Sequence, residues 1–210
     1  AREVLVDETY LEMIRDSWLV KKVIFLCAFF SYLCGEENPY QKFQRYMNVN
    51  EGHLLNIQIS QSLADQHFNS NGILYYFQNR EYVFDSTSER ITYKDGEIET
   101  LNKAEKQIIY DSDIENNLNI FDLFSGKDNH IKIRDSFIEN KIQITKFFLD
   151  DWDMKGTIWT VPATGKPKKI TLNLSVDETV SLNISSSKII STMEIPDIDI
   201  SEYEIIDLRE

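Results

Sequence analysis

Alternating apolar and polar residues dominate the chain from residue 52 onward and predict a series of β-strands. In the segment LLNIQISQSL, Leu55, Ile57 and Ile59 alternate with polar residues, which is the two-residue period of a half-buried strand. Asp95-Gly96 is a strong signal for a two-residue hairpin turn. Short strands joined by polar turns, such as the one expected at residues 65–72, indicate an antiparallel meander. The other predicted strands have the sequences ILYYF, YVFD, RITYK, EIETL, KQIIYD, HIKI, FIENKIQITKFFLD, KGTIWTV, KKITLNLS, TVSLNIS, KIIST and EYEIIDL.

Two short helices are predicted to interrupt the strand pattern. Asn38-Pro39 can cap a first helix, in which Phe43 and Tyr46 lie three residues apart on one face. A second helix is predicted for residues 116–126, which end at a glycine, the residue type most common just after a helix. Its apolar residues at helical spacing are Leu118, Phe121 and Phe124.

Several strands, among them ILYYF, KFFL and TIWTV, are apolar on both faces. One face can pack in a core, and the other must also be covered or must bind an apolar ligand. A concave sheet lined by Leu, Ile, Tyr and Phe would form a pocket for acyl chains. A closed core would show the same pattern without a pocket, so the pattern leaves both structures open.

The charge of the chain limits its partners. It carries 35 Asp and Glu against 22 Lys and Arg, which gives a formal net charge of −13. A nucleic-acid binder needs a basic stripe, and here the Lys and Arg residues are scattered among acids, so nucleic acid is excluded as a partner. Anionic membrane surfaces are also expected to repel such a chain. The 210 residues, 42% of them hydrophobic, suffice for one domain with a sizeable core.

Cysteine and histidine residues give little support for metal or thiol chemistry. Cys27 and Cys34 both lie in an apolar run, and removal of that run would leave no thiol for disulfides, zinc binding or nucleophilic catalysis. His53, His67 and His130 lack the short spacings of a metal site, and we expect them to be solvated residues in or beside turns. No metal and no cofactor is predicted.

The amino-terminal region resembles an export signal. Residues 20–35, VKKVIFLCAFFSYLCG, comprise a basic pair, a short apolar run and a small residue near the end, the organisation of a secretory signal peptide. The run is too short to span a bilayer core, and a buried core helix is the alternative. Leu33 before Cys34 fits a lipidation signal poorly. Residues 1–19 are predicted to be an upstream extension, in which REVLV resembles the extreme carboxyl end of FtsK-type DNA translocases.

Two groups of acidic residues are candidates for catalysis. Asp150, Asp151 and Asp153 share one turn, and Asp197 and Asp199 alternate near the end of the chain. Paired carboxylates can perform acid–base chemistry or bind Ca²⁺, but the first cluster lacks the sharp-turn glycine and the distal Glu of a calcium loop. The segment ATGKPKK lacks the upstream Gly and the following Ser or Thr of a P-loop. We therefore expect solvated turn residues and no enzymatic activity.

Several motifs follow one another in a defined order. A predicted signal peptide and a short helix precede LLNIQISQ, which ends at Gln61, and the aromatic strand that follows Gly72. YVFD then leads through RITY to Lys94-Asp95-Gly96, IFDLFSG supplies a helix that ends in Ser-Gly, and EIIDL is the last strand. In this order and spacing, residues 38–210 resemble the periplasmic lipoprotein carrier family, LolA.

This resemblance implies a mainly β fold, a single curved, unclosed antiparallel sheet (a half-barrel) with short helices covering its concave face. In the family, the cavity between sheet and helices takes up the acyl chains of a lipoprotein, without covalent chemistry. The resemblance, together with the apolar phase of the early strands, implies that residues 36–210 form a carrier domain. Its lid is expected to contain Leu118, Phe121 and Phe124. The expected cavity-lining residues are Leu55, Ile57, Ile59, Leu74, Tyr76, Tyr82, Phe84, Ile91 and Tyr93.

The resemblance also implies a latch and a set of partners. Family members commonly carry Arg-Pro at the end of the first aromatic strand, where the arginine holds the lid helices. This chain has Gln78-Asn79 there, and Arg80, on the same face of a strand as Gln78, is the candidate substitute. The implied protein is a periplasmic monomer that accepts acylated lipoproteins from an inner-membrane lipoprotein-releasing ABC transporter and passes them to an outer-membrane acceptor. A lipidated acceptor of the LolB type and an extracytoplasmic binder of another apolar ligand are the alternatives.

Overall fold

The computed structural model of the protein describes residues 37–77, 81–113, 120–125, 131–190 and 195–209. The chain divides into two units, Ala1–Glu37 and Asn38–Glu210, and all the helices and strands of the described residues belong to the second. The predicted extension and signal peptide lie outside the described residues, as do Arg80, Leu118 and His130. Within the described part of the chain, no helix is both long and apolar enough to cross a membrane.

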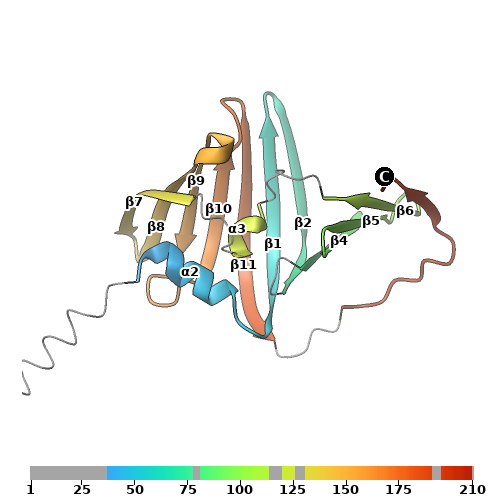
Figure 1. Cartoon of the computed structure of the whole chain (residues 1–210), viewed down its shortest axis with the longest axis horizontal. Helices are drawn as coiled ribbons and strands as arrows, with labels where there is room; N and C mark the ends of the chain where they lie inside the picture. Colours follow the sequence, from blue (N-terminus) through green and yellow to red (C-terminus); the bar gives the residue numbers. More distant parts are fainter. Residues whose placement is uncertain (1–36, 78–80, 114–119, 126–130, 191–194, 210) are drawn as a thin grey trace, which may run out of the picture. The chain divides into compact units, whose positions relative to one another are not determined.

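The described strands form one twelve-stranded sheet in the order β12-β6-β5-β4-β3-β2-β1-β11-β10-β9-β8-β7 (Figure 1). The two outermost strands, β12 and β7, do not pair with each other, so the sheet is unclosed. The prediction of a mainly β fold built on a single unclosed sheet is confirmed. The strands are β1 Gly52–Leu63, β2 Gln66–Tyr76, β3 Tyr82–Ser86, β4 Glu89–Lys94, β5 Glu97–Asn102, β6 Gln107–Ser112, β7 Ile131–Glu139, β8 Ile142–Leu149, β9 Met154–Thr160, β10 Pro167–Asn173, β11 Glu178–Ile190 and β12 Glu204–Asp207.

Two antiparallel meanders make up most of this sheet and meet at its centre. Strands β1 to β6 follow one another from the centre to one edge, and β11 back to β7 do the same toward the other edge. The meanders are joined by the pairing of β1 with β11, which places Leu63 beside Glu178 at one end and Gly52 beside Ile190 at the other. A bulge between Asn56 and Ile57 interrupts this register.

Strand β12 departs from the predicted antiparallel pattern, because it runs parallel to β6. The chain reaches this edge through residues 195–203, and Arg90 of β4 donates a 2.7 Å hydrogen bond from Nη1 to the Pro196 carbonyl oxygen. Asp85 forms two salt bridges, one from Oδ2 to Nη2 of Arg90 at 2.7 Å and one from Oδ1 to Nζ of Lys103 at 2.5 Å. Burial acts to raise the pKa of Asp85, but the hydrogen bonds and charges of Arg90 and Lys103 outweigh it and lower this pKa. The path of the segment therefore sets the direction of β12.

Two turns differ from those expected. The loop predicted at residues 65–72 is a tight turn at Ala64 and Asp65, and strand β2 already includes His67 and Gly72. Conversely, the segment predicted as one strand from Phe137 onward is divided by a turn at Asn140 and Lys141, whose φ angles are 50° and 64°. Such angles suit the two-residue turns that match the twist of a hairpin. The first half of β2 extends beyond the core and is mainly polar on both faces, which caused the first error. A turn without glycine caused the second.

Helix α2 (Pro39–Met47) begins at a capping box. The Asn38 side chain accepts a 2.8 Å hydrogen bond from the backbone N–H of Gln41, and the Gln41 side chain accepts one from the backbone N–H of Asn38 at 3.1 Å. Pro39 occupies the first helical position, where no backbone N–H is needed. The second described helix, α3 (Asp122–Ser125), is much shorter than the predicted helix at residues 116–126, of which residues 116–119 and 126 lie outside the described residues.

Both helices lie on the same side of the sheet, which we call its inner face; the opposite side is the outer face (Figure 1). Inward-facing side chains of both meanders pack with the helices into one core. The buried members of this core are Tyr40, Phe43, Met47, Leu55, Ile57, Leu74, Tyr76, Tyr82, Phe84, Tyr93, Phe121, Leu123, Phe124, Phe147, Leu149, Ile158, Ile170, Leu172, Leu182 and Ile184.

A glycine on the inner face allows one aromatic ring to lie flat against the sheet. Gly156 of β9 is paired with Phe147 of β8, and a Cβ atom added to Gly156 would overlap the Phe147 ring. The ring is 2% exposed, so it has little room to move aside. The glycine is therefore required by packing rather than by its backbone angles.

We predict that Gly156→Ala destabilises the protein by about 1–3 kcal/mol, the usual range for overpacking a core. Urea unfolding measures this change in the free energy of unfolding. In a Phe147→Leu background, the same glycine substitution should cost clearly less, because the overlapping ring is gone. Equal costs in the two backgrounds would show that the contact between Gly156 and Phe147 does not determine the effect.

Candidate functional site

The nine residues predicted to line a cavity come together on the inner face of β1 to β4. Cross-strand pairing places Leu55 beside Leu74, Leu74 beside Phe84, and Phe84 beside Ile91. A second row consists of Tyr76, Tyr82 and Tyr93. Seven of the nine are buried, and the other two, Ile59 and Ile91, are partly buried at the margin of the same core. The register therefore puts the whole predicted set on one face, where it forms a continuous apolar surface.

Residues 120–125, which we call the α3 segment, cover this surface. Phe121 packs edge to face against Tyr82, with ring centroids 4.8 Å apart. Phe124 packs in the same way against Tyr76, with ring centroids 5.3 Å apart. Phe124 also contacts Phe43 of α2, with ring centroids 5.9 Å apart. Edge-to-face pairs of this kind add about 0.5–1.5 kcal/mol to the burial of the rings. Two of the three predicted lid residues thus lie against the predicted lining.

The sequence-based prediction missed part of the apolar site. Helix α2 contributes Tyr40, Phe43 and Met47, whose spacing of three and four residues is the signal of a buried helical face. The second meander also contributes inward side chains, in the same two-residue alternation that was used for Leu55 and Ile57. These residues of β8 to β11 are Phe147, Leu149, Ile158, Ile170, Leu172, Leu182 and Ile184.

A few hydrogen bonds hold the two helices in place. Tyr40 donates a 3.3 Å hydrogen bond from its hydroxyl to the Leu123 carbonyl oxygen, and the Asn48 amide donates one of 3.1 Å to that of Phe124. These bonds join α2 to the α3 segment. Tyr46 and Ser187 of β11 share a hydrogen bond of 2.8 Å between their hydroxyl oxygens, which joins α2 to the sheet. The described cover is thus fixed mainly by apolar packing, with few directional bonds.

His53 lies at the edge of this site and is wholly buried, so the expectation that it is solvated is wrong. Neither ring nitrogen has a hydrogen-bond partner among the described residues. Its ring lies 5.1 Å from that of Tyr46 on α2. Burial lowers the pKa of His53, although the backbone of Tyr46 and Met47 and the charge of Glu51 act in the opposite direction. His67, by contrast, is exposed on the outer face of β2.

The acidic residues considered for catalysis lie apart from the apolar site. Asp150 is paired with Lys132, and Asp199 accepts a 3.0 Å hydrogen bond from the Ser201 backbone N–H, which lowers the pKa of Asp199. Asp197 is exposed. Among the described residues, no group of three His, Cys, Asp or Glu side chains is placed to hold a metal ion. The chemistry that the described site offers is the burial of apolar groups.

Comparison with known proteins gives structural matches only. No protein-family model and no curated protein matches the chain. The fold is similar to that of an uncharacterized conserved protein from Thermus thermophilus, with a TM-score of 0.52 and 7% identity over 80% of this chain and 96% of that one. This match shows a shared fold.

Two further solved structures resemble the chain at lower scores. A LolA superfamily protein from Nitrosomonas europaea matches with a TM-score of 0.43 and 12% identity over 75% of this chain and 93% of that one. A proposed outer membrane lipoprotein-sorting protein domain from Vibrio parahaemolyticus matches with a TM-score of 0.44 and 9% identity over 74% of this chain and 92% of that one. Both similarities lie in the structure and are accompanied by low sequence identity.

The buried His53 predicts a loss of stability in acid. Its pKa is lowered below the ordinary value of 6.5, so as the pH falls through 6.5 the unfolded chain takes up a proton that the folded protein does not. The stability present above pH 6.5 should decrease as the pH falls toward the folded-state pKa. Urea unfolding of His53→Gln should show a shallower loss between about pH 7 and 5 than the unsubstituted protein does. His67→Gln, the same change at an exposed histidine, should keep the original slope, and an unchanged slope in His53→Gln would contradict the assignment.

Proposed function

We propose that this protein is a carrier that binds the acyl chains of lipid-modified proteins on the inner face of its sheet. The observation that carries the proposal is the continuous apolar surface of β1 to β4 under a cover of two short helices. The four-residue α3 and the nine-residue α2 are small compared with the sheet that they cover. A cover of this kind can move without disrupting the strand pairing below it.

In the proposed mechanism, an acyl chain takes the place of the aromatic side chains of the α3 segment. Phe121 and Phe124 lie against Tyr82 and Tyr76, so an acyl chain entering there would meet the same surface. Each methylene removed from water contributes about 0.8 kcal/mol to the free energy of binding, and an acyl chain of ordinary length contains many methylenes. That gain can offset the aromatic packing that is given up when the cover is displaced. Binding and release then need only a difference in affinity between two conformations, with no covalent step.

We further propose that the cargo consists of acylated lipoproteins crossing the periplasm. The order of motifs in residues 38–210 supports this cargo, as does the signal-like segment at residues 20–35. An inner-membrane lipoprotein-releasing transporter and an outer-membrane acceptor would then be the donor and the recipient. A carrier of single acyl chains would use the same apolar surface, so a triacylated lipoprotein and a free fatty acid should be compared as ligands.

The test compares two glutamate substitutions on neighbouring residues of β1. Ile57 faces the inner core and is 4% exposed, whereas Gln58 is exposed on the outer face. Ile57→Glu should lower the affinity for a triacylated lipoprotein at least about tenfold, because a carboxylate in an apolar site is costly to desolvate. Gln58→Glu should bind as the unsubstituted protein does. Native mass spectrometry after detergent removal measures the soluble one-to-one complex, and circular dichroism verifies that both variants fold.

A second variant tests whether the cover must open. Tyr46→Phe removes the hydrogen bond between α2 and Ser187 of β11, which is worth about 1 kcal/mol. If that bond breaks when cargo enters, the variant should bind acyl chains up to about fivefold more tightly. Lipoprotein that precipitates while every variant stays unliganded would contradict the proposed function.

A further inference from the structure

The outer face of six neighbouring strands carries no acidic residue, although the chain contains 35 of them. Along β8, β9, β10, β11, β1 and β2, the side chains opposite to the core are amides, hydroxyls, cations and apolar groups. One row across the sheet runs Trp159, Lys169, Asn183, Gln58 and Asn71. The acid-free face is thus a continuous surface assembled from both meanders.

Four cations on this side, one each from β7 to β10, lie over or beside aromatic rings. The guanidinium of Arg134 lies 5.2 Å from the ring centre of Phe148, and the ammonium of Lys146 lies 5.4 Å from that of Phe137. Lys169 lies 5.2 Å from the ring centre of Trp159. We call Arg134, Lys146 and Lys169, together with Lys155 of β9, the basic patch. Among the described residues, none of these four cations forms a salt bridge, in a protein with ample carboxylates to supply one.

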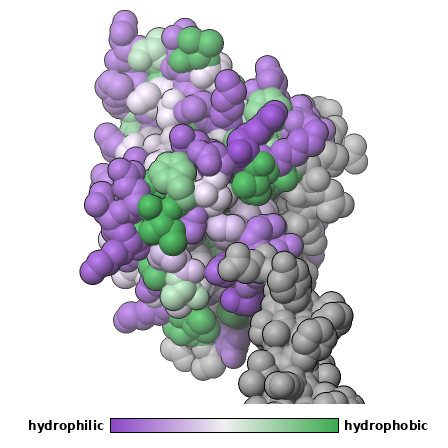
Figure 2. All heavy atoms as spheres, turned by 90° about the vertical axis from the view of Figure 1, so that its left-hand side faces the viewer, coloured by the Kyte–Doolittle hydropathy of each residue, from purple (hydrophilic) through white to green (hydrophobic). Residues whose placement is uncertain are grey.

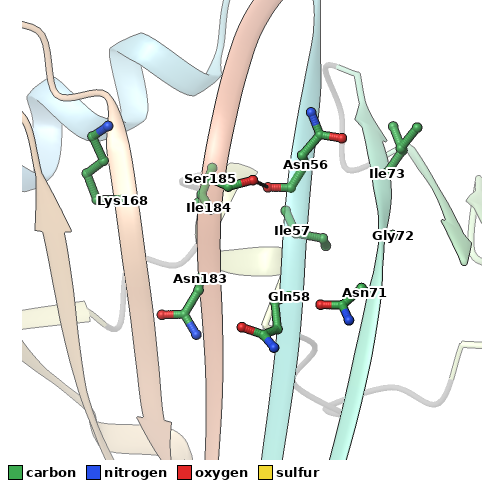
Figure 3. Close-up of a pocket in the computed structure, with 10 residues that line it drawn as sticks. All are labelled: Asn56, Ile57, Gln58, Asn71, Gly72, Ile73, Lys168, Asn183, Ile184 and Ser185. Carbon is green, nitrogen blue, oxygen red and sulfur yellow. Dashed lines mark hydrogen bonds between the residues drawn. The ribbon is translucent and has the colours of Figure 1, made fainter.

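Two recesses mark this face. The first, of about 650 Å³, is lined by Arg134, Lys146 and Lys155 together with Phe148 and Trp159. The second, of about 560 Å³, lies over β11, β1 and β2 beside Lys168 of β10. Figure 3 shows the amides of its wall side by side on neighbouring strands. The first recess offers cations and flat apolar rings, and the second offers hydrogen-bond donors without a negative charge. The amides shown there are Asn56, Gln58, Asn71 and Asn183.

The acidic residues nearest to the patch lie at its margin, on the edge strand β7 and in turns. Asp153 borders the first recess at the turn between β8 and β9. Asp135 of the edge strand β7 lies opposite Lys146 in the strand register, on the same face of the sheet. Asp65 and Asp177 occupy turns at the strand ends. At physiological ionic strength, charges are screened beyond about 8 Å. The negative net charge therefore acts weakly on a surface in contact with the basic patch.

We propose that the basic patch binds the surface of a lipid bilayer that contains anionic phospholipids. Phosphate groups complement the four cations, and the glycerol and ester oxygens of the headgroups can accept hydrogen bonds from the neighbouring amides and hydroxyls. Edge strand β7 adds Phe137, which is 37% exposed and whose pairing with Ile144 of β8 puts it on the same face as the patch. Figure 2, viewed from the side of β7, shows hydrophobic side chains set among hydrophilic ones at this edge of the sheet.

Apolar and aromatic groups beside cations favour a bilayer over a soluble polyanion. Aromatic rings and long basic side chains are the groups that settle at the boundary between headgroups and acyl chains. A soluble polyanion would use the cations but would leave the exposed ring of Phe137 in water. This inference does not depend on the proposed carrier function, because the patch and the apolar site lie on opposite faces of the sheet.

The test measures binding of the full chain to vesicles by flotation. The protein should float with vesicles of phosphatidylcholine mixed with phosphatidylglycerol, less so at high salt, and should not float with phosphatidylcholine alone. Each Lys near an anionic surface contributes about 1 kcal/mol, so Lys146→Gln/Lys155→Gln should reduce partitioning about 30-fold. Lys94→Gln/Lys106→Gln removes the same charge from exposed positions near the opposite edge of the sheet and should change partitioning little.

Three outcomes would overturn the inference: equal binding to both kinds of vesicle, equal effects of the two double variants, or binding to heparin without binding to vesicles. The last result would assign the patch to a soluble polyanion. Ile57→Glu, which is designed to impair acyl-chain binding, should float as the unsubstituted protein does. Loss of carrier activity and loss of vesicle binding are therefore distinguished by separate variants.

Discussion

The structure depends on covering the inner face of a sheet that does not close on itself. A closed barrel buries its interior with its own strands, whereas this sheet leaves β7 and β12 unpaired with each other and must bury its apolar face against something else. Helix α2 and the α3 segment supply that cover with Phe43, Phe121 and Phe124. The capping box of α2 and the close fit of Phe147 over Gly156 both serve this one packing problem.

The two faces of the sheet have different chemistry. The inner face is mainly apolar across both meanders, and two of its buried polar residues, His53 and Ser187, lie beside α2. The outer face is divided. On β3 to β6 the outer face carries Asp85 and Arg90, which fix the segment leading to β12. On the six neighbouring strands β8, β9, β10, β11, β1 and β2, the outer face carries no acidic residue. A single sheet can therefore present an apolar surface to one partner and a polar, cationic surface to another.

Much of this arrangement could be predicted from residue periodicity. The alternation around Leu55 indicated the inner face of β1, and helical spacing indicated the lid positions Phe121 and Phe124. The same alternation also placed His53 on the inner face, but its polarity led to the opposite expectation. Burial of a lone histidine depends on the helix packed above it, which local sequence does not reveal. The direction of β12 depends on the path of residues 195–203, and the basic patch depends on the register of four strands, neither of which is a local property.

The pairing of β1 with β11 has a consequence for the order in which the protein can fold. Partners in this pair, such as Asn56 and Ser186, are 130 residues apart in the sequence. During synthesis the first meander is made long before the strand that completes its central edge. Until β11 emerges, β1 presents a row of unpaired backbone groups, which other chains can pair with. The central seam of the sheet thus stays open until β11 emerges, and the nascent chain has to be protected there for most of its synthesis.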